Sequence, residues 1–218
     1  MDIIRPKYYI FLGPPGGGKG TQAKKLAQKL GYFYFGMGNL LRQEAKNKTP
    51  LGTKFQAILD KDQGGLISDQ ELNNFLSQTF SKLTKYQGVV FDGIPRTLAQ
   101  AQYLTTLLGN NHQAQVINLE VNDNLLIERI QTRRVCAKCE KIFFQPEKIG
   151  INQCPCGGRL IQRQEDKVEV FKKRLAIYRQ ETLPIIDYYQ KRGILLDING
   201  DPSIDKVWEE IVKKLRLD

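Results

Sequence analysis

Apolar residues along the chain follow two alternating patterns: short continuous runs, and stretches with one apolar residue every three or four positions. The first pattern is typical of buried strands and the second of helices that cover them. The continuous runs occupy residues 8–12, 89–91, 115–121 and 194–196. Helical spacing is found at 19–30 and at 38–62, with a break near Thr49-Pro50, and again from 68 onward and at 97–108. A further helical segment ends at 133, another runs from 168 to an end or bend at Pro184, and the last occupies 204–215.

Strands that alternate with helices in this way predict an α/β fold. Consecutive strands then run parallel in one sheet, and the connecting helices cover both of its faces. Sheets of this kind bind ligands at the carboxyl ends of their strands. Two glycine-bearing segments follow predicted strands directly, after Leu12 and after Phe91. We therefore expect the functional site between these two segments.

The composition is that of an ordinary globular chain with a bias toward positive charge. Of 218 residues, 41% are hydrophobic, and no apolar run reaches the roughly 18 residues of a membrane span. The start of the sequence lacks the apolar stretch of a secretory signal, so we expect a cytoplasmic protein without membrane contact. The net charge of +10 favours anionic partners, such as nucleotides, nucleic acid or anionic lipid.

Glycines dominate the segment Gly13-Pro14-Pro15-Gly16-Gly17-Gly18-Lys19-Gly20-Thr21, which lies between a predicted strand and a predicted helix. Backbone N–H groups of such a loop can surround phosphate oxygens, and the start of the helix adds a partial positive charge. Lys19 can reach a transferring phosphate, and the Thr21 hydroxyl can bind phosphate or magnesium. The usual phosphate-loop pattern has Ser or Thr after the lysine, where this chain has Gly20. The segment still predicts a phosphate site rather than a plain structural turn.

All four cysteines lie within 21 residues of one another, at 136, 139, 154 and 156. Two closely spaced pairs can present four thiolates in a tetrahedron, which is the usual arrangement of structural zinc. We therefore predict one structural zinc ion on Cys136, Cys139, Cys154 and Cys156. The alternatives are a metal-free cluster of thiols and a disulfide. The second pair, Cys154-Pro155-Cys156, is one residue shorter than the first, which leaves the geometry of its turn open.

Several segments resemble the adenylate kinases and their nucleoside monophosphate kinase relatives. The loop from Gly13 to Gln22 matches their phosphate loop, and Asp92-Gly93-Ile94-Pro95-Arg96-Thr97 matches their second signature. Gly38-Asn39-Leu40-Leu41-Arg42 is similar to their monophosphate-binding stretch, and Arg133-Arg134-Val135 with Arg163 to Arg174 is similar to the two ends of their lid. The match covers nearly the whole chain and resembles the bacterial type with a long lid. It implies a core of residues 1–36, 68–133 and 166–218, a monophosphate-binding subdomain of residues 37–67, and a lid of residues 134–165.

The resemblance also implies a role for each matching residue. Arg129 would lie against the ATP adenine, Gln100 would contact the AMP base, and Asp92 would hold Mg²⁺ through water. The implied catalytic residues are Lys19, Asp92, Arg96, Arg133, Arg163 and Arg174. The implied ATP-binding residues are Gly16, Gly17, Gly18, Lys19, Gly20, Thr21, Arg129, Arg133, Ile142 and Phe143. The implied AMP-binding residues are Met37, Gly38, Arg42, Gly65, Leu66, Ile67, Gly93, Ile94, Pro95, Arg96, Gln100, Arg163 and Arg174.

The implied activity is reversible, magnesium-dependent conversion of ATP and AMP to two ADP, with the lid closing over both nucleotides. The implied partners are ATP and AMP or ADP, with no nucleic acid and no membrane, and the chain is expected to be a monomer. This chain departs from the family at Gly36-Met37, where Ser-Thr is usual, and at Asn39, where aspartate is usual. A kinase for GMP or for UMP and CMP therefore remains an alternative. A basic, zinc-containing nucleic-acid-binding module and an inactive nucleotide sensor are two further alternatives.

Overall fold

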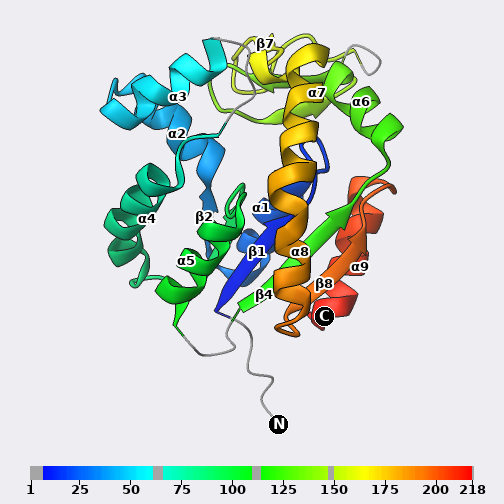
Figure 1. The fold of residues 1–218 in the computed structure, drawn as a ribbon. Helices are drawn as coiled ribbons and strands as arrows, with labels where there is room; N and C mark the ends of the chain where they lie inside the picture. Colours follow the sequence, from blue (N-terminus) through cyan, green and yellow to red (C-terminus); the bar gives the residue numbers. More distant parts are fainter. Residues whose placement is uncertain (1–6, 61–65, 110–113, 147–149, 218) are drawn as a thin grey trace.

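A five-stranded parallel sheet forms the centre of the computed structural model (Figure 1), which describes residues 7–60, 66–109, 114–146 and 150–217. The strand order is β2-β3-β1-β4-β8. The strands are β1 (Tyr8–Leu12), β2 (Phe33–Gly36), β3 (Val89–Asp92), β4 (Ala114–Glu120) and β8 (Leu195–Asn199). Four of the five strands are predicted by the sequence, and β2 is not. Gly65, which the resemblance implies for AMP, lies outside the described residues.

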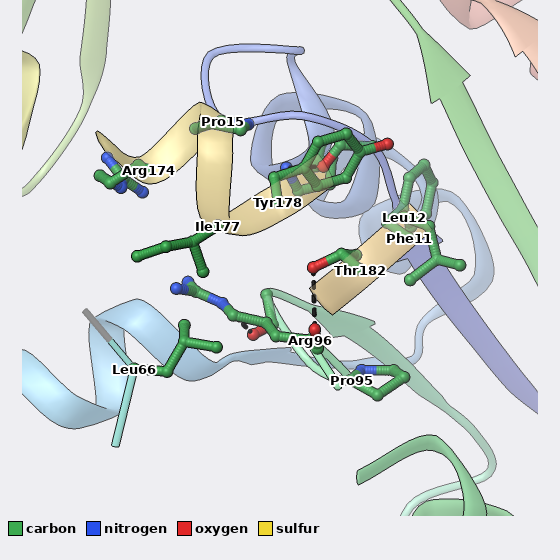
Figure 2. Close-up of a pocket in the computed structure, with 13 residues that line it drawn as sticks. Phe11, Leu12, Pro15, Leu66, Pro95, Arg96, Arg174, Ile177, Tyr178 and Thr182 are labelled. Carbon is green, nitrogen blue, oxygen red and sulfur yellow. Dashed lines mark hydrogen bonds between the residues drawn. The ribbon is translucent and has the colours of Figure 1, made fainter. Parts of the chain in front are cut away.

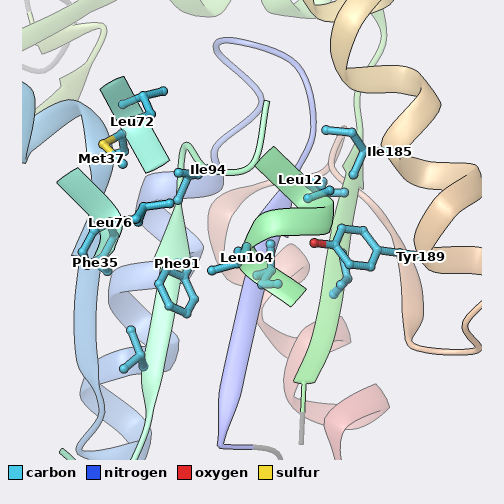
Figure 3. Close-up of a cluster of buried hydrophobic side chains, with 14 of the residues drawn as sticks. Leu12, Phe35, Met37, Leu72, Leu76, Phe91, Ile94, Leu104, Ile185 and Tyr189 are labelled. Atoms are coloured by element: carbon cyan, nitrogen blue, oxygen red, sulfur yellow. The ribbon is translucent and has the colours of Figure 1, made fainter. Parts of the chain in front are cut away.

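Side chains of β1 alternate between the two faces of the sheet, and each face has its own cluster of buried apolar residues. Tyr9 and Phe11 pack in one cluster, with α1 and α9. Ile10 and Leu12 pack in the other, with α4, α5 and α8 (Figure 3). These helices are α1 (Lys19–Leu30), α4 (Asp69–Leu83), α5 (Leu98–Leu108), α8 (Leu183–Gln190) and α9 (Ile204–Leu215). The prediction of helices on both faces is confirmed.

Local signals fix the ends of several helices. Gly18, with φ of 89°, precedes α1, and Gly31, with φ of 67°, ends it. Both residues adopt a left-handed conformation that favours glycine. Ser68 precedes α4, where its hydroxyl accepts a hydrogen bond from the backbone N–H of Glu71 and donates one to the Glu71 carboxylate. The Ser68 side chain therefore caps the start of α4.

Two segments extend beyond the carboxyl edge of the sheet. One consists of α2 (Met37–Lys46) and α3 (Pro50–Asp60), and the break between them falls where the sequence predicts it. The other is an antiparallel sheet of order β6-β5-β7, made of β5 (Arg133–Cys136), β6 (Ile142–Phe144) and β7 (Leu160–Ile161). We refer to residues 134–165 as the lid. It lies between α6 (Asp123–Thr132) and α7 (Val168–Ile177), beside α3 in Figure 1.

A π-helical turn interrupts the long helix near the end of the chain. The turn, Tyr178–Thr182, joins α7 to α8, and Pro184 lies in the first turn of α8. Proline lacks an N–H group, and its ring displaces the carbonyl four residues earlier, so a wider turn at this point accommodates it. The sequence predicts an end or bend near Pro184, and the structure shows the α-helix giving way to the π-helical turn just before it.

Candidate active site

Charged side chains gather in one cavity, which we call the central cavity, at the carboxyl ends of β1 and β3. It is lined by the phosphate loop, by Asp92 at the end of β3, and by residues of α2 and the lid. Its cationic lining residues are Lys19, Lys24, Arg42, Arg96, Arg133, Arg163 and Arg174, and its carboxylates are Asp92 and Glu165. Five of the six arginines predicted to bind nucleotide therefore line one cavity, together with Lys19. Such an excess of positive charge suits a strongly anionic ligand.

Lys19 is folded back onto its own loop. Its Nζ donates hydrogen bonds to the backbone oxygens of Gly13 and Pro14, each at 2.7 Å. Burial lowers the pKa of the Lys19 ammonium to about 7, the Asp92 carboxylate opposes this shift, and the neighbouring guanidinium groups add to it. A phosphate group beside this amine would favour its charged form and raise the pKa again.

We expect nucleotide binding to take up protons in proportion to this shift. A free-enzyme pKa of about 7 for Lys19 leaves about half of the chains uncharged there at pH 7 and most of them uncharged at pH 8. Binding of magnesium-complexed ATP should then take up about half a proton at pH 7, close to one at pH 8 and little at pH 6. Calorimetry in buffers of different ionisation enthalpy measures the uptake. The pH dependence should disappear in Lys19→Met, and an unchanged uptake in that variant would assign the proton to another group.

Arg96 and Arg174 are as deeply buried as Lys19. Burial lowers the pKa of both guanidinium groups, that of Arg174 to about 10. The Asp92 and Glu165 carboxylates oppose the shift of Arg96, whereas Arg42 adds to it, and Arg96 in turn lowers the pKa of Arg174. Arg96 donates from Nε to the Gly93 oxygen at 3.0 Å, and the Thr182 hydroxyl donates to the Arg96 backbone oxygen at 2.8 Å (Figure 2). The π-helical turn thus holds the segment that carries Arg96. Both arginines also line a smaller cavity beside Lys19, drawn in Figure 2.

Acidic residues at the lid boundary hold other arginines in place. Arg133 pairs with the fully buried Asp166, and its Nε donates to Asp166 Oδ2 at 2.8 Å. Arg42 lies 3.3 Å from Glu165 Oε1. Burial opposes ionisation of Glu165, but the guanidinium groups of Arg174, Arg42 and Arg163 together lower the pKa of its carboxyl below the usual value. A carboxylate therefore lies among the arginines that the resemblance assigns to phosphate.

A second cavity, the α6 cavity, opens on the other side of the phosphate loop. It has a volume of about 260 Å³ and is lined by Gly16, Gly17, Gly18, Thr21, Arg129 and Phe144, and by residues after β8. Arg129 donates to the backbone oxygens of Gly200 and Asp201, at 2.9 and 3.0 Å, so it fixes the wall of this cavity. Arg129, which the resemblance implies for the ATP adenine, therefore lies at the edge of this cavity.

Phe143 does not line any of these cavities, contrary to the role implied for it. Side chains of a strand alternate between its faces, so Ile142 and Phe144 of β6 point the same way and Phe143 points the other way. Ile142 and Phe144 both line the central cavity, whereas the Phe143 ring lies 5.6 Å from the Lys141 ammonium. The phenyl ring beside the phosphate loop is therefore that of Phe144.

A third cavity, the α3 cavity, adjoins the central cavity on the side of α2 and α3. Of the residues implied for AMP, it is lined by Met37, Gly38, Arg42, Leu66, Ile67, Gly93, Arg96 and Arg174. The sequence did not single out its other apolar lining residues, Leu41, Phe55, Ile58, Leu59, Leu72 and Val170. They continue the apolar faces of their helices and look like ordinary core positions. Arg42, Arg96 and Arg174 line both this cavity and the central one, so these three guanidinium groups lie where the two cavities meet.

Four of the described residues implied for AMP lie outside the α3 cavity: Arg163, which lines the central cavity, and Ile94, Pro95 and Gln100. Ile94 is fully buried in the core, and Pro95 lines only the small cavity of Figure 2. Gln100 is also fully buried, where it accepts a hydrogen bond from the Arg96 N–H at 2.8 Å and donates one to Asp69 at 2.7 Å. In this structure Gln100 ties the Arg96 segment to α4. Its contact with the base stays a prediction.

The four cysteines come together in the lid as the sequence predicts. All four are free thiols, and their sulfur atoms lie within 4.8 Å of one another. Cys136 and Cys156 Sγ are 3.4 Å apart, and Cys139 and Cys154 Sγ are 3.5 Å apart. Four sulfurs at about 2.3 Å from a zinc ion would be separated by about 3.8 Å, so the cluster fits zinc. Backbone N–H groups of Cys139 and Lys138 donate to Cys136 Sγ and lower the pKa of that thiol to about 6.

A turn closes the shorter cysteine pair. The Gly157 N–H donates to the Cys154 oxygen at 2.8 Å, and Gly157 has φ of 79°. A Cβ on Gly158 would lie 2.4 Å from Cys136 Sγ. The two glycines therefore allow Cys154-Pro155-Cys156 to bring both sulfurs to the cluster, which answers the question that the spacing leaves open.

Comparison with known proteins decides the family. A family model described as adenylate kinase matches residues 11–194. The chain belongs to the adenylate kinase family. It is 40% identical to the adenylate kinase of Archaeoglobus fulgidus over 208 residues, which cover 93% of this chain and 94% of the relative. It is 41% identical to that of Caldanaerobacter subterraneus subsp. tengcongensis over 215 residues, 96% of each chain, and 38% identical to that of Thermodesulfovibrio yellowstonii over 207 residues.

Membership of the adenylate kinase family supports the AMP-directed reaction over the alternatives that the sequence leaves open. The fold is that of the family, with a parallel sheet, helices on both faces and a phosphate loop after β1. Adenylate kinases are nucleoside monophosphate phosphotransferases that bind ATP, AMP and ADP. In the described part of the chain, no helix combines the length and the apolar character that a membrane span requires.

Proposed function

We propose that the chain transfers a phosphoryl group between ATP and AMP through the central cavity, with the ATP base in the α6 cavity and the AMP base in the α3 cavity. One observation carries this proposal: Lys19, Asp92 and five arginines line a single cavity between the two side cavities. Transfer between two nucleotides places several negative charges at one point, so its catalysis is mostly positioning and charge stabilisation. The site needs no side-chain nucleophile, because a phosphate of AMP is the acceptor.

The proposed roles follow the positions of the residues. Lys19 and the loop N–H groups bind the ATP phosphates, and Arg133 at the end of α6 and Arg163 in the lid approach them. Arg42 binds the phosphate of AMP. Arg96 and Arg174 lie between the two nucleotides and stabilise the charge of the group in transfer. Closure of the lid over the cavity excludes water, which strengthens each of these interactions.

Asp92 is the candidate for holding the magnesium of ATP. Its carboxylate lines the central cavity beside Gly20 and Thr21, and carboxylate and hydroxyl oxygens are ligands that Mg²⁺ accepts directly or through water. Magnesium would neutralise the phosphate charge that develops during transfer. The contribution of the chain is to hold the carboxylate in place beside the phosphate loop.

An acceptor comparison tests the proposed reaction. With ATP and magnesium saturating, we expect kcat/KM for AMP to exceed that for GMP, UMP and CMP by about 100-fold or more, since a base pocket that pairs polar groups rejects bases that leave them unpaired. A coupled assay for ADP formation measures it. Met37 lines the α3 cavity without a hydroxyl, so a strong preference for AMP would show that selectivity does not require a hydroxyl at that position. Higher activity with another monophosphate would overturn the substrate assignment.

We further propose that the lid binds one zinc ion, which stabilises it without taking part in transfer. Thiolates fit a reducing compartment, and we propose a cytoplasmic monomer. Removal of zinc by a chelator should lower the melting temperature by about 5–10 °C, because each kcal/mol of lost stability corresponds to about 2–4 °C in a chain of this size. Calorimetry and elemental analysis measure both effects. The melting temperature of Cys139→Ser should be lower than that of the unchanged protein even before chelation, and it should change little when chelator is added.

Activity at low temperature should survive chelation in part, since the phosphate loop and Arg96 lie outside the lid. Four freely titrating thiols without bound metal, or a disulfide in protein purified under reducing conditions, would contradict the zinc proposal.

A further inference from the structure

Two departures in the sequence meet at one side chain in the structure. Gly20 replaces the Ser or Thr that follows the lysine of the usual phosphate loop, and Gly36 precedes Met37 where the family usually has serine. Tyr34, which the sequence does not single out, lies between these two glycines and lines the central cavity. Its hydroxyl donates a hydrogen bond to Asp92 Oδ2 at 2.7 Å.

Gly36 makes room for the ring of Tyr34. In the parallel pairing of β2 and β3, Gly36 lies opposite Asp92, and Tyr34 precedes Gly36 by two residues on the same face of the strand. The ring must therefore cross Gly36 to reach Asp92. A Cβ on Gly36 would lie 2.7 Å from both Cε1 and the hydroxyl oxygen of Tyr34, which is closer than atoms can approach.

Gly20 makes room for the carboxylate that Tyr34 holds. A Cβ on Gly20 would lie 2.9 Å from Asp92 Oδ2 and 3.5 Å from the Tyr34 hydroxyl. In the usual phosphate loop, the hydroxyl of the residue at this position binds magnesium. In this chain the carboxylate and the phenol occupy that space instead.

We propose that Tyr34 is a positioning residue for phosphoryl transfer: it fixes Asp92 Oδ2 in the space left by Gly20, so that Oδ1 is the oxygen presented to the magnesium of ATP. Among the described residues, no hydrogen bond to Oδ1 is formed. The inference rests on the proposed role of Asp92 and adds to it the residue that sets the orientation of the carboxylate.

The hydrogen bond between Tyr34 and Asp92 has a defined direction and lies among several cations. The Tyr34 hydroxyl is the donor and Asp92 Oδ2 the acceptor of this hydrogen bond. The Arg42 and Arg163 guanidinium groups also act on the hydroxyl, and the Lys24 ammonium lies 5.3 Å from the centroid of the ring. A carboxylate with one oxygen fixed by a donor has less freedom to rotate, which favours a single orientation toward a metal-bound water.

Binding of Mn²⁺ to the enzyme tests the inference without a measurement of activity. The probe is Mn²⁺ titrated into enzyme saturated with a compound that joins two adenosines through five phosphates, followed by electron paramagnetic resonance. Tyr34→Phe keeps the ring and removes the hydroxyl, so we expect Mn²⁺ to bind about 3- to 10-fold more weakly. Loss of a residue that orients a metal ligand typically weakens metal binding about 10- to 100-fold, and we expect a smaller loss here because Asp92 acts through water. Affinity for the adenosine compound in EDTA should change less than twofold.

Three further variants separate the possible outcomes. Tyr188→Phe removes a hydroxyl that bonds Thr105 at 3.2 Å, far from Asp92, and should leave Mn²⁺ binding unchanged. Tyr34→Phe should cause no further loss in an Asp92→Asn background, because both act through one carboxylate. Gly36→Ala, which displaces the ring by collision, should weaken Mn²⁺ binding in the same direction.

Equal Mn²⁺ affinity in Tyr34→Phe and Tyr188→Phe would overturn the inference. Equal losses of affinity for the adenosine compound with and without metal would do so as well, since they indicate a general disturbance of the fold. If Asp92→Asn itself leaves Mn²⁺ affinity unchanged, the proposed role of Asp92 fails first. If Asp92→Asn weakens Mn²⁺ binding and Tyr34→Phe does not, only the role of Tyr34 fails.

Discussion

Replacement of Lys19 by methionine should lower kcat/KM by about 100- to 1000-fold. Lys19 is the buried cation of the phosphate loop itself. Loss of one preorganised charge contact of this kind typically costs about 3–4 kcal/mol of transition-state stabilisation. The fold should remain intact, because burial already disfavours the charged amine and lowers its pKa to about 7. Removal of that charge should leave the melting temperature of the nucleotide-free protein unchanged or slightly higher.

Lys25→Met is the matched control for this experiment. Lys25 lies on the same helix, α1, and pairs with the exposed Asp205 at 2.7 Å, away from the central cavity. Its loss should change kcat/KM less than twofold, since surface ion pairs contribute little. A Lys19→Met variant that keeps most of its activity would show that the phosphate loop is not the site of transfer.

Replacement of Arg174 by methionine should have an effect of similar size but a different kinetic form. Arg174 lines the central cavity, the α3 cavity and the small cavity beside Lys19, so it contacts the space between both nucleotides. We expect kcat to fall by about 100- to 1000-fold, with each KM changed less than about 10-fold, which indicates an interaction made mainly in the transition state. Arg174→Lys should recover little, because an amine lacks the planar fork of guanidinium.

Arg179→Met, five residues further along, serves as the control for Arg174. Its guanidinium pairs with Asp123 on the surface, and its side chain is about half exposed, so kcat should stay within twofold of the unchanged protein. Initial-rate kinetics with each nucleotide varied in turn measure these values. A rise in one KM alone, with kcat preserved, would place Arg174 at a single nucleotide rather than between two.

Much of the fold can be predicted because its strands and helices carry strong local patterns. The strand β2 is missed because it has only four residues, the aromatic run Phe33-Tyr34-Phe35 and a glycine. It shows neither alternation of apolar and polar residues nor a turn signal of its own. Its β-propensity is high, and that could have identified it. The lid strands are equally short, and β7 has only two residues, so their pairing depends on contacts distant in sequence.

The candidate site is predicted best where a motif fixes both residue and spacing, as in the phosphate loop and the segment from Asp92 to Arg96. It is predicted least well where the register of a strand decides which side chain points inward. Phe143 and Phe144 differ by one position, and a shift of one residue reverses the face of the strand. The wall of the α6 cavity near Gly200 follows the last strand and carries no motif, so only the fold brings it to the phosphate loop.

Because cations outnumber carboxylates in the central cavity, the stability of the folded state should depend on bound adenine nucleotides. Buried guanidinium groups that face one another raise the free energy of the empty protein, and phosphates relieve that repulsion only in the folded chain. A ligand that binds only the folded form at 100 times its Kd adds about 2.7 kcal/mol to the free energy of unfolding. The heat resistance of this protein in a cell should therefore follow the supply of adenylates, and starvation that depletes them would expose it to unfolding and proteolysis.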